Sequence, residues 1–312
     1  LSKKFGNKRV IEIPTSESAA TGIAIGAAIQ GMKVILTHQR VEFSLLSMEQ
    51  IINQAAKLYF LSNGKYKISV VIRVMIGKGW GQGPQHSQSL ETLFAHIPGL
   101  KVVSPSNAYD AKGLLNSAIN SGHPVIFFEH RWLHNIEANV PKKLYKMPFG
   151  KAKIIQNGKD ITIISFSEAL VQVLRLREIL SKSKISAEII DIRSLRPLDK
   201  KTIIKSLKKT RKVLVVDNGW KTYGIGSEII SILSEEKSIN FKSKPMRLGI
   251  KELPIPSSRA IATESYLSPQ KILDAISKVS SKKINLASKK EFENKYLHEP
   301  TDVPYKDFKG PF

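Results

Sequence analysis

The chain has 312 residues, about twice the usual size of a single domain, and 42% of them are hydrophobic, which suffices for ordinary globular cores. It contains no cysteine, which excludes disulfides, thiolate metal sites and cysteine nucleophiles. No apolar run is long enough to span a bilayer and no signal-peptide pattern opens the chain. We therefore expect a cytoplasmic protein without a membrane partner. Because the chain starts at Leu1 without a methionine, we also expect a fragment or one half of a longer chain.

The formal net charge is +23, which allows two interpretations. Clustered lysines and arginines bind polyanions, so nucleic-acid binding without catalysis is one hypothesis. The basic residues are, however, scattered through both halves, and no arginine-rich arm or basic patch with interleaved aromatic residues stands out. We favour a lysine-rich bias spread over solvated faces, with an acidic partner subunit as its corollary. We expect no nucleic-acid partner.

Strand-like and helix-like segments alternate in the first half. The apolar patterns predict strands at 10–13, 34–36, 70–74, 101–103 and 125–128, and helices at 19–30, 48–61 and 108–119. Alternation of this kind implies a mainly parallel sheet with helices on both faces.

The alternation restarts after a segment that carries prolines and lysines. It predicts strands at 161–165, 187–192, 213–216 and 246–248, and helices at 169–180, 200–207, 225–233 and 269–279. We predict an α/β protein of two tandem doubly wound domains with mainly parallel sheets. The first domain covers 1–135, a linker 136–155, the second domain 156–280, and a C-terminal tail 281–312.

Glu17 lies where the first predicted strand gives way to the helix 19–30. In open α/β sheets, ligands gather at the carboxyl ends of strands, so this carboxylate could point into a site. It could also be a helix-start carboxylate that the helix dipole favours. From position alone, the second interpretation is the stronger.

A glycine-rich loop follows the strand 70–74, with four glycines in the seven residues 77–83. Such a loop lets backbone approach a ligand or another subunit closely. His86 follows the loop and is an acid–base candidate, because imidazole exchanges protons near neutral pH. A structural role for this histidine is the alternative. The sequence holds no phosphate loop, dinucleotide fingerprint, nucleophile elbow or metal-binding His-Glu-x-x-His helix, so no metal ligand is predicted.

Gly22 and Gly26 lie one turn apart on the helix 19–30, where another backbone can pack closely. The partner surface is either this chain's own sheet or another subunit.

The segment 85–89, with the sequence Gln-His-Ser-Gln-Ser, opens a block that resembles a known family. Together with matching stretches along the chain, it closely resembles the beta subunits of 2-oxoacid dehydrogenase decarboxylating components, of the pyruvate, branched-chain and acetoin type. The matching stretches are 94–103, 110–115, 124–129, 191–199, 224–228 and 302–312. The resemblance covers almost the whole chain. It implies a transketolase-like pyrimidine-binding domain followed by a transketolase C-terminal domain.

The resemblance also implies an activity. Such subunits belong to thiamine-diphosphate-dependent enzymes that decarboxylate a 2-oxoacid and transfer the acyl unit to a lipoyl protein. Glu17 matches the glutamate that hydrogen-bonds a ring nitrogen of the cofactor's aminopyrimidine. Phe43 matches the aromatic ring packed against that group. His86 matches the histidine that assists acyl transfer.

The family's alpha-type half carries a Gly-Asp-Gly motif that holds Mg²⁺ and the diphosphate, and this sequence has no such motif. The resemblance therefore implies an alpha-type subunit, or a fused alpha-type region, as a partner. It also implies a second copy of the chain in an α2β2 assembly, and a lipoyl acyltransferase core.

His38 and Arg40 depart from the family's more apolar pattern. If they reach the site, they suit a polar or anionic reactant. They could as well lie in a solvated or partner-facing loop. The alternative function is therefore a transketolase-like carboligase that passes a two-carbon unit to an aldehyde or sugar. The sequence leaves the 2-oxoacid and the acceptor open.

Overall fold

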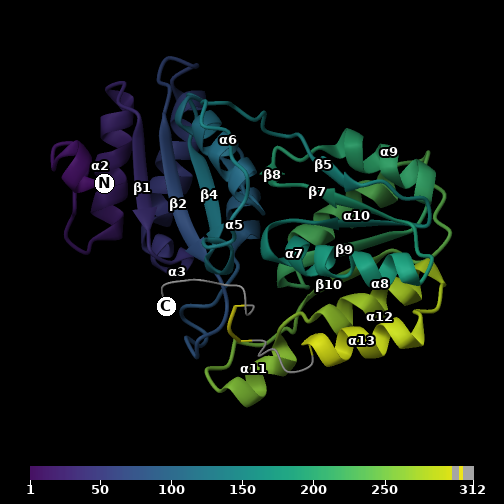
Figure 1. Cartoon of the computed structure of the whole chain (residues 1–312). Coiled ribbons are helices and arrows are strands. Elements are labelled where there is room, and N and C mark those ends of the chain that lie inside the picture. Colours follow the sequence, from purple (N-terminus) through teal and green to yellow (C-terminus); the bar gives the residue numbers. More distant parts are fainter. Residues whose placement is uncertain (297–301, 305–312) are drawn as a thin grey trace.

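Two sheets of five strands each form the framework of this computed structural model, which describes residues 1–296 and 302–304 (Figure 1). The rest of the predicted tail, 297–301 and 305–312, lies outside the described residues. In the first sheet, four parallel strands are joined at one edge by an antiparallel strand from the second half of the chain. The order is β1 (Val34–His38), β2 (Val70–Ile76), β4 (Val125–His130), β3 (Lys101–Val103) and β8 (Ser194–Arg196).

The second sheet is parallel except for its last strand, which pairs antiparallel with its neighbour. Its order is β10 (Met246–Ile250), β9 (Val213–Trp220), β6 (Ile161–Ser165), β7 (Ala187–Asp191) and β5 (Lys153–Gln156). The predicted α/β fold with mainly parallel sheets is therefore confirmed.

Helices cover both sheets. The helical elements of the first half are α1 (Ser2–Phe5), α2 (Glu17–Ile29), α3 (Val41–Ser44), η1 (Leu45–Ser47), η2 (Gln50–Ala55), α4 (Ala56–Leu61), α5 (Glu91–Ala95), α6 (Ala108–Ile119) and η3 (Arg131–Leu133), of which α1 buries no residue. In the second half they are α7 (Ser167–Arg175), α8 (Arg177–Lys182), α9 (Lys200–Thr210), α10 (Ile225–Glu235), α11 (Arg259–Ser265), α12 (Pro269–Ser280) and α13 (Leu286–Tyr296). None of the described helices is long and apolar enough to cross a membrane.

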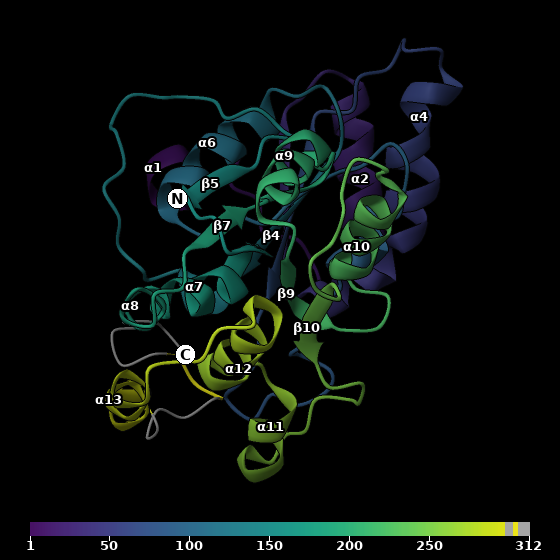
Figure 2. The same cartoon turned by 90° about the vertical axis from the view of Figure 1, so that its right-hand side faces the viewer.

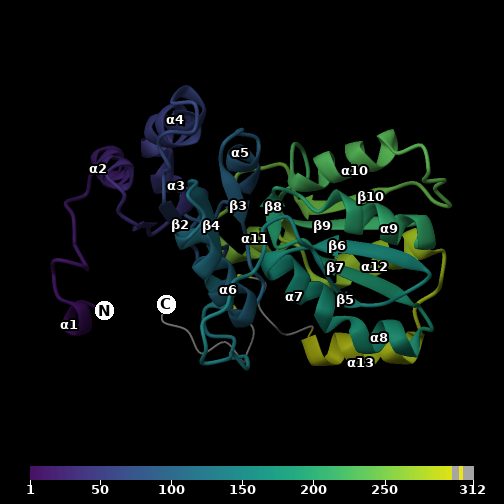
Figure 3. The same cartoon turned by 90° about the horizontal axis from the view of Figure 1, so that it is seen from above.

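Successive side chains of a strand point to opposite faces of the sheet, so each central strand packs against different helices on its two faces. On β9, Val213 and Val215 pack with residues of α9 and α10, whereas Leu214 and Val216 pack with residues of α7, α8 and α12. Figure 3 shows α10 and α8 on opposite sides of this sheet. On the outside, α13 lies along α8, and Lys182 pairs with Glu291 at 3.0 Å (Figure 2). The first sheet also has a hydrophobic cluster on each face. The cluster on the face covered by α2 continues into the second half of the chain.

The strand predicted at 10–13 is wrong. These residues form no strand, and the side chains of Ile11 and Ile13 are 69% and 47% exposed. A strand needs a neighbour to pair with, and the edge strand β1 pairs with β2 alone. The apolar side chains of Ile11 and Ile13 are therefore not buried against other parts of the described chain.

The helix predicted at 48–61 is a continuous helical run that passes through the π-helical segment η2 before α4. Its inner face carries Ile51 and Ala55, which are fully buried. Turns of π-helix are often found beside functional sites.

Candidate active site

An open pocket of about 370 Å³ lies where β1 ends and α2 begins. Its walls come from three segments: the stretch before α2, the carboxyl end of β1, and α3. The lining residues are Ile13, Pro14, Thr15, Ser16, Glu17, Ala20, Leu36, Thr37, His38, Gln39 and Phe43. The pocket thus combines an apolar wall, an aromatic ring and a carboxylate.

Glu17 is the first residue of α2, and its side chain lines this pocket. A carboxylate is favoured at this position because the helix dipole is positive at the N-terminus. Its backbone carbonyl accepts a hydrogen bond of 2.7 Å from the hydroxyl of Thr21 one turn later. Both interpretations offered by the sequence therefore apply, since Glu17 starts the helix and also faces a pocket.

His38 reaches the same pocket, so it does not lie in a solvated loop. Its side chain is buried, and its Nε2 lies 3.3 Å from the hydroxyl of Thr21, which in turn lies 2.9 Å from the hydroxyl of Ser47. Burial lowers the pKa of His38 and the nearby Glu17 carboxylate opposes this change. His38 therefore presents a neutral imidazole to the pocket at neutral pH.

Arg40 is buried as well, but it is not among the residues that line the pocket. Its guanidinium donates a hydrogen bond of 3.0 Å to the carbonyl of Gly77 and another to the side chain of Gln82. Burial, with Arg131 nearby, lowers the pKa of Arg40 to about 10, so the group stays charged at neutral pH. Arg40 holds the glycine-rich loop against the start of α3.

His86 meets Phe43 beside the pocket. The ring centroids are 5.5 Å apart and the planes are inclined by 78°, an edge-to-face contact. Nearby, the backbone N–H of Gln88 donates a 2.8 Å hydrogen bond to Glu42. Burial raises the pKa of Glu42, and this hydrogen bond opposes the rise. The helix that carries Phe43 is thus tied to the segment that carries His86.

Sequence reasoning missed Glu42, Thr21 and Ser47. Their only signal was proximity along the chain to Phe43 or Glu17. A single carboxylate or hydroxyl in a helical segment is far more often solvated than functional, so nothing in the sequence singled them out.

The pocket suits a flat heteroaromatic ring with a nitrogen that hydrogen-bonds a carboxylate. Ile13, Pro14 and Leu36 can contact such a ring, and Glu17 can hold its nitrogen. The lining includes no lysine or arginine to neutralise a phosphate. In the part of the chain that the structure describes, no three His, Asp or Glu side chains gather as metal ligands.

Both halves of the chain match known domain families. Residues 1–135 match the transketolase pyrimidine-binding domain, and residues 150–272 match the transketolase C-terminal domain. Among solved structures, "Split gene transketolase, inactive beta4 tetramer" has a TM-score of 0.72 over 85% of this chain and 82% of its own, at 22% identity. This likeness supports the fold.

Curated relatives are closer in sequence. The pyruvate dehydrogenase E1 component subunit beta of Porphyra purpurea is 39% identical over 91% of this chain and 86% of its own length. The protein of the same name from Cyanidium caldarium is 40% identical over 88% and 84%. The human mitochondrial protein is 37% identical over 89% and 79%.

These names do not favour the carboligase alternative, because the similarity to a transketolase is the weaker one, at 22% identity. The chain belongs to the family of pyruvate dehydrogenase E1 component beta subunits, the beta-type subunits of thiamine-diphosphate-dependent 2-oxoacid dehydrogenases.

Proposed function

We propose that this chain supplies the aminopyrimidine half of a shared thiamine diphosphate site. An alpha-type chain, or a fused alpha-type region, holds the diphosphate and Mg²⁺, and the assembly decarboxylates a 2-oxoacid and passes the acyl unit to a lipoyl protein. The observation that carries this proposal is that Glu17 and Phe43 line one pocket, with His86 in edge-to-face contact with Phe43.

In this proposal each side chain has one task. Glu17 holds a proton at a ring nitrogen of the aminopyrimidine, and Phe43 packs against that ring and fixes its orientation. When bound, thiamine diphosphate supplies a nucleophilic carbon and an electron sink for decarboxylation. His86 holds or moves a proton during transfer of the acyl unit.

The neutral His38 adds a polar side chain to the same wall. It lies in the network of Thr21 and Ser47, and the hydroxyl of Thr21 also donates to the backbone carbonyl of Glu17. We propose that this network fixes the start of α2, and with it the backbone of Glu17. Arg40 acts at a distance from the pocket, through the glycine-rich loop.

Surface features of the first half support a partner and a second copy of the chain. A Cβ added at Gly26 would meet nothing within 4 Å inside the chain, so this side of α2 is open next to the helix backbone. Several apolar side chains are also exposed there, namely Ile11, Ile13, Ile23, Met32 and Ile35. Surfaces of this kind are typical of subunit interfaces. We propose an α2β2 assembly, with a lipoyl acyltransferase core as a further partner.

The proposal is tested with this chain assembled with an alpha-type chain from the same source. We expect carbon dioxide release that depends on a 2-oxoacid and on thiamine diphosphate, and acylation of an added lipoyl domain. A correctly assembled sample that releases no carbon dioxide from pyruvate, branched-chain 2-oxoacids or other 2-oxoacids would refute it.

A further inference from the structure

Lys78 is a buried lysine near the start of the glycine-rich loop. Its side chain is 10% exposed, and its ammonium lies 3.6 Å from Glu168 at the start of α7 in the second half of the chain. It also lies 4.9 Å from the ring centroid of Trp132 and 5.1 Å from that of Tyr266. Cations bind the faces of aromatic rings, and they do so more strongly when removed from water. Two rings and a carboxylate therefore form a cage around this ammonium.

Polar groups around this cage already have hydrogen-bond partners. Glu168 accepts a 2.6 Å hydrogen bond from Gln172, and the backbone N–H of Trp132 donates a 3.2 Å bond to Nδ1 of His130. Burial lowers the pKa of His130 to about 3, so this neighbour of the cage is neutral. Among these side chains, the ammonium of Lys78 therefore supplies the positive charge that offsets the negative charge of the Glu168 carboxylate.

The loop needs such an anchor. Gly77, Gly79, Gly81 and Gly83 all have positive φ, and glycine-rich backbone loses much conformational freedom when it is held in one shape. The backbone N–H of Trp80 also donates a 2.7 Å hydrogen bond to the carbonyl of Asp302. Lys78 therefore adds a charged side-chain tie to a loop that is also held by Arg40, by this backbone bond and by the edge contact of Trp80 with Trp132.

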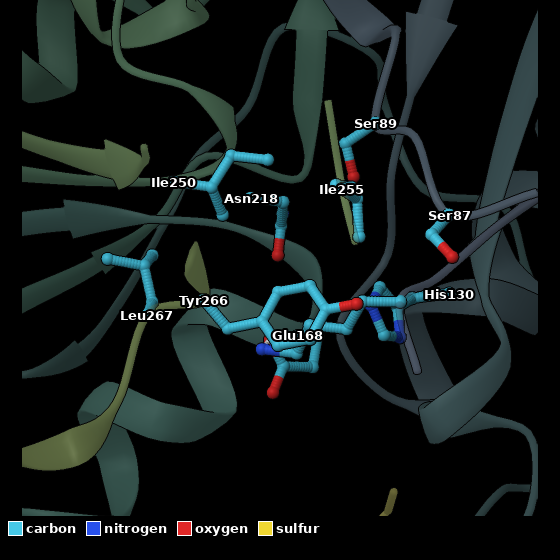
Figure 4. A pocket seen from close by; sticks show the side chains of 10 residues that line it. Ser87, Ser89, His130, Glu168, Asn218, Ile250, Ile255, Tyr266 and Leu267 are labelled. Atoms are coloured by element: carbon cyan, nitrogen blue, oxygen red, sulfur yellow. Dashed lines mark ion pairs between the residues drawn. The ribbon is translucent and has the colours of Figure 1, made fainter. Parts of the chain in front are cut away.

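The cage adjoins the segment that carries His86. Figure 4 shows Ser87, Ser89, His130, Glu168 and Tyr266 around one cavity, which Lys78 also lines. Its free volume is about 10 Å³, enough for about one water molecule. Since the packing leaves so little room, a displacement of the Lys78 side chain has to move its neighbours. Ser87 is one of these, and it is bonded directly to His86.

We propose that Lys78 is a positioning residue for acyl transfer: caged by Trp132, Tyr266 and Glu168, it fixes the glycine-rich loop and so places His86. The inference rests on the role proposed for His86. It predicts that removing the charge affects the transfer step selectively, because the aminopyrimidine pocket is built from other segments.

The test uses the assembled enzyme and measures two half-reactions. Reduction of an artificial electron acceptor such as ferricyanide reports decarboxylation, and acylation of a lipoyl domain reports transfer. For Lys78→Met we expect the kcat of lipoyl acylation to fall roughly 10- to 100-fold, as expected for a misplaced catalytic group. The KM for the 2-oxoacid and the rate with ferricyanide should stay within about 2-fold of the values for the unsubstituted enzyme. The substitution leaves the interactions that bind the 2-oxoacid unchanged.

Lys78→Arg keeps the charge and should restore a large part of the acylation rate. Lys251→Met is the matched control, because the Lys251 side chain is 54% exposed and pairs with the exposed Glu264. Glu168→Gln keeps the size of its side chain and removes the counter-charge, so it provides the test if Lys78→Met does not fold. It should show the same selective loss, and the two substitutions together should cost less than the sum of their separate effects.

An equal loss in both half-reactions, or Lys78→Met and Glu168→Gln variants that acylate as fast as Lys251→Met, would overturn the inference. Failure of the proposed function is distinguishable, because it would appear in the unsubstituted assembly as an absence of 2-oxoacid-dependent ferricyanide reduction.

Discussion

The imidazole of His86 meets the ring of Phe43 edge to face, with centroids 5.5 Å apart. Phe43 follows β1 and His86 follows β2. These strands are parallel neighbours, with His38 opposite Val74, so their carboxyl ends lie side by side. The site therefore follows from the general rule that loops at the carboxyl ends of parallel strands carry the functional groups.

Glu17→Gln should nearly abolish turnover and leave the assembly intact. The amide keeps the shape of the side chain but cannot exchange a proton, so we expect kcat to fall at least about 100-fold. Rates of carbon dioxide release and light scattering of the purified assembly measure the two effects. Glu235→Gln, at an exposed position on α10, is the control. Activity retained in Glu17→Gln would remove Glu17 from its proposed role.

His86→Ala should impair lipoyl acylation more than decarboxylation. A general acid or base contributes about 100-fold or more to the step that it serves. Comparison of lipoyl acylation with ferricyanide reduction in the same preparation separates the steps. Parallel losses in both would contradict the division of labour between Glu17 and His86.

Gly26→Gln should weaken assembly without harming the fold of the chain. An added Cβ meets nothing within 4 Å inside the chain, and a helix interior gains up to about 1 kcal/mol when glycine is replaced by a good helix former. Size-exclusion chromatography with light scattering measures assembly, and thermal unfolding measures the fold.

Gly99→Ala is the opposite case, because Gly99 has φ +98° and an added Cβ would lie 1.9 Å from the carbonyl oxygen of Ala56. It should destabilise the chain itself.

If Gly26→Gln assembles normally, α2 does not face a subunit at Gly26.

Glu91 should make the stability depend on pH. Burial, together with the nearby Asp217, raises the pKa of Glu91 to about 8 in the folded chain, from 4.5. The folded state therefore keeps a proton that the unfolded chain releases, and stability falls as pH rises between these values. Relative to the unsubstituted chain, Glu91→Gln should be more stable at about pH 9 than at about pH 5, since it cannot ionise.

Urea unfolding at the two pH values measures this difference, and comparison at equal pH cancels other titrating groups. A difference in stability that does not change with pH would show that Glu91 ionises normally in the folded chain.

Local pattern predicted the regular elements well where the interactions are local. The strand 101–103 and the helix 108–119 have the predicted bounds, because their apolar residues are buried in the hydrophobic core. The strand at 10–13 failed because an apolar run does not reveal whether its partner is in the same chain. The strand Ser194–Arg196 escaped prediction because it is short and pairs with a distant segment.

The candidate site, too, was only partly predictable from the local sequence. Position alone made Glu17 a helix-start carboxylate, and only the family resemblance made it a candidate cofactor ligand. The cage around Lys78 was not predictable, because Glu168 and Tyr266 are far away in the sequence and a single lysine in a loop has no distinctive pattern.

The central claim is that this chain holds one half of a shared cofactor site. Its most direct test is calorimetric titration of thiamine diphosphate with Mg²⁺, first into this chain alone and then into its assembly with an alpha-type chain. Tight binding in the assembly, with weak or no binding to the chain alone, is the predicted result. Equally tight binding to the chain alone, or no binding to a correctly formed assembly, would contradict the account.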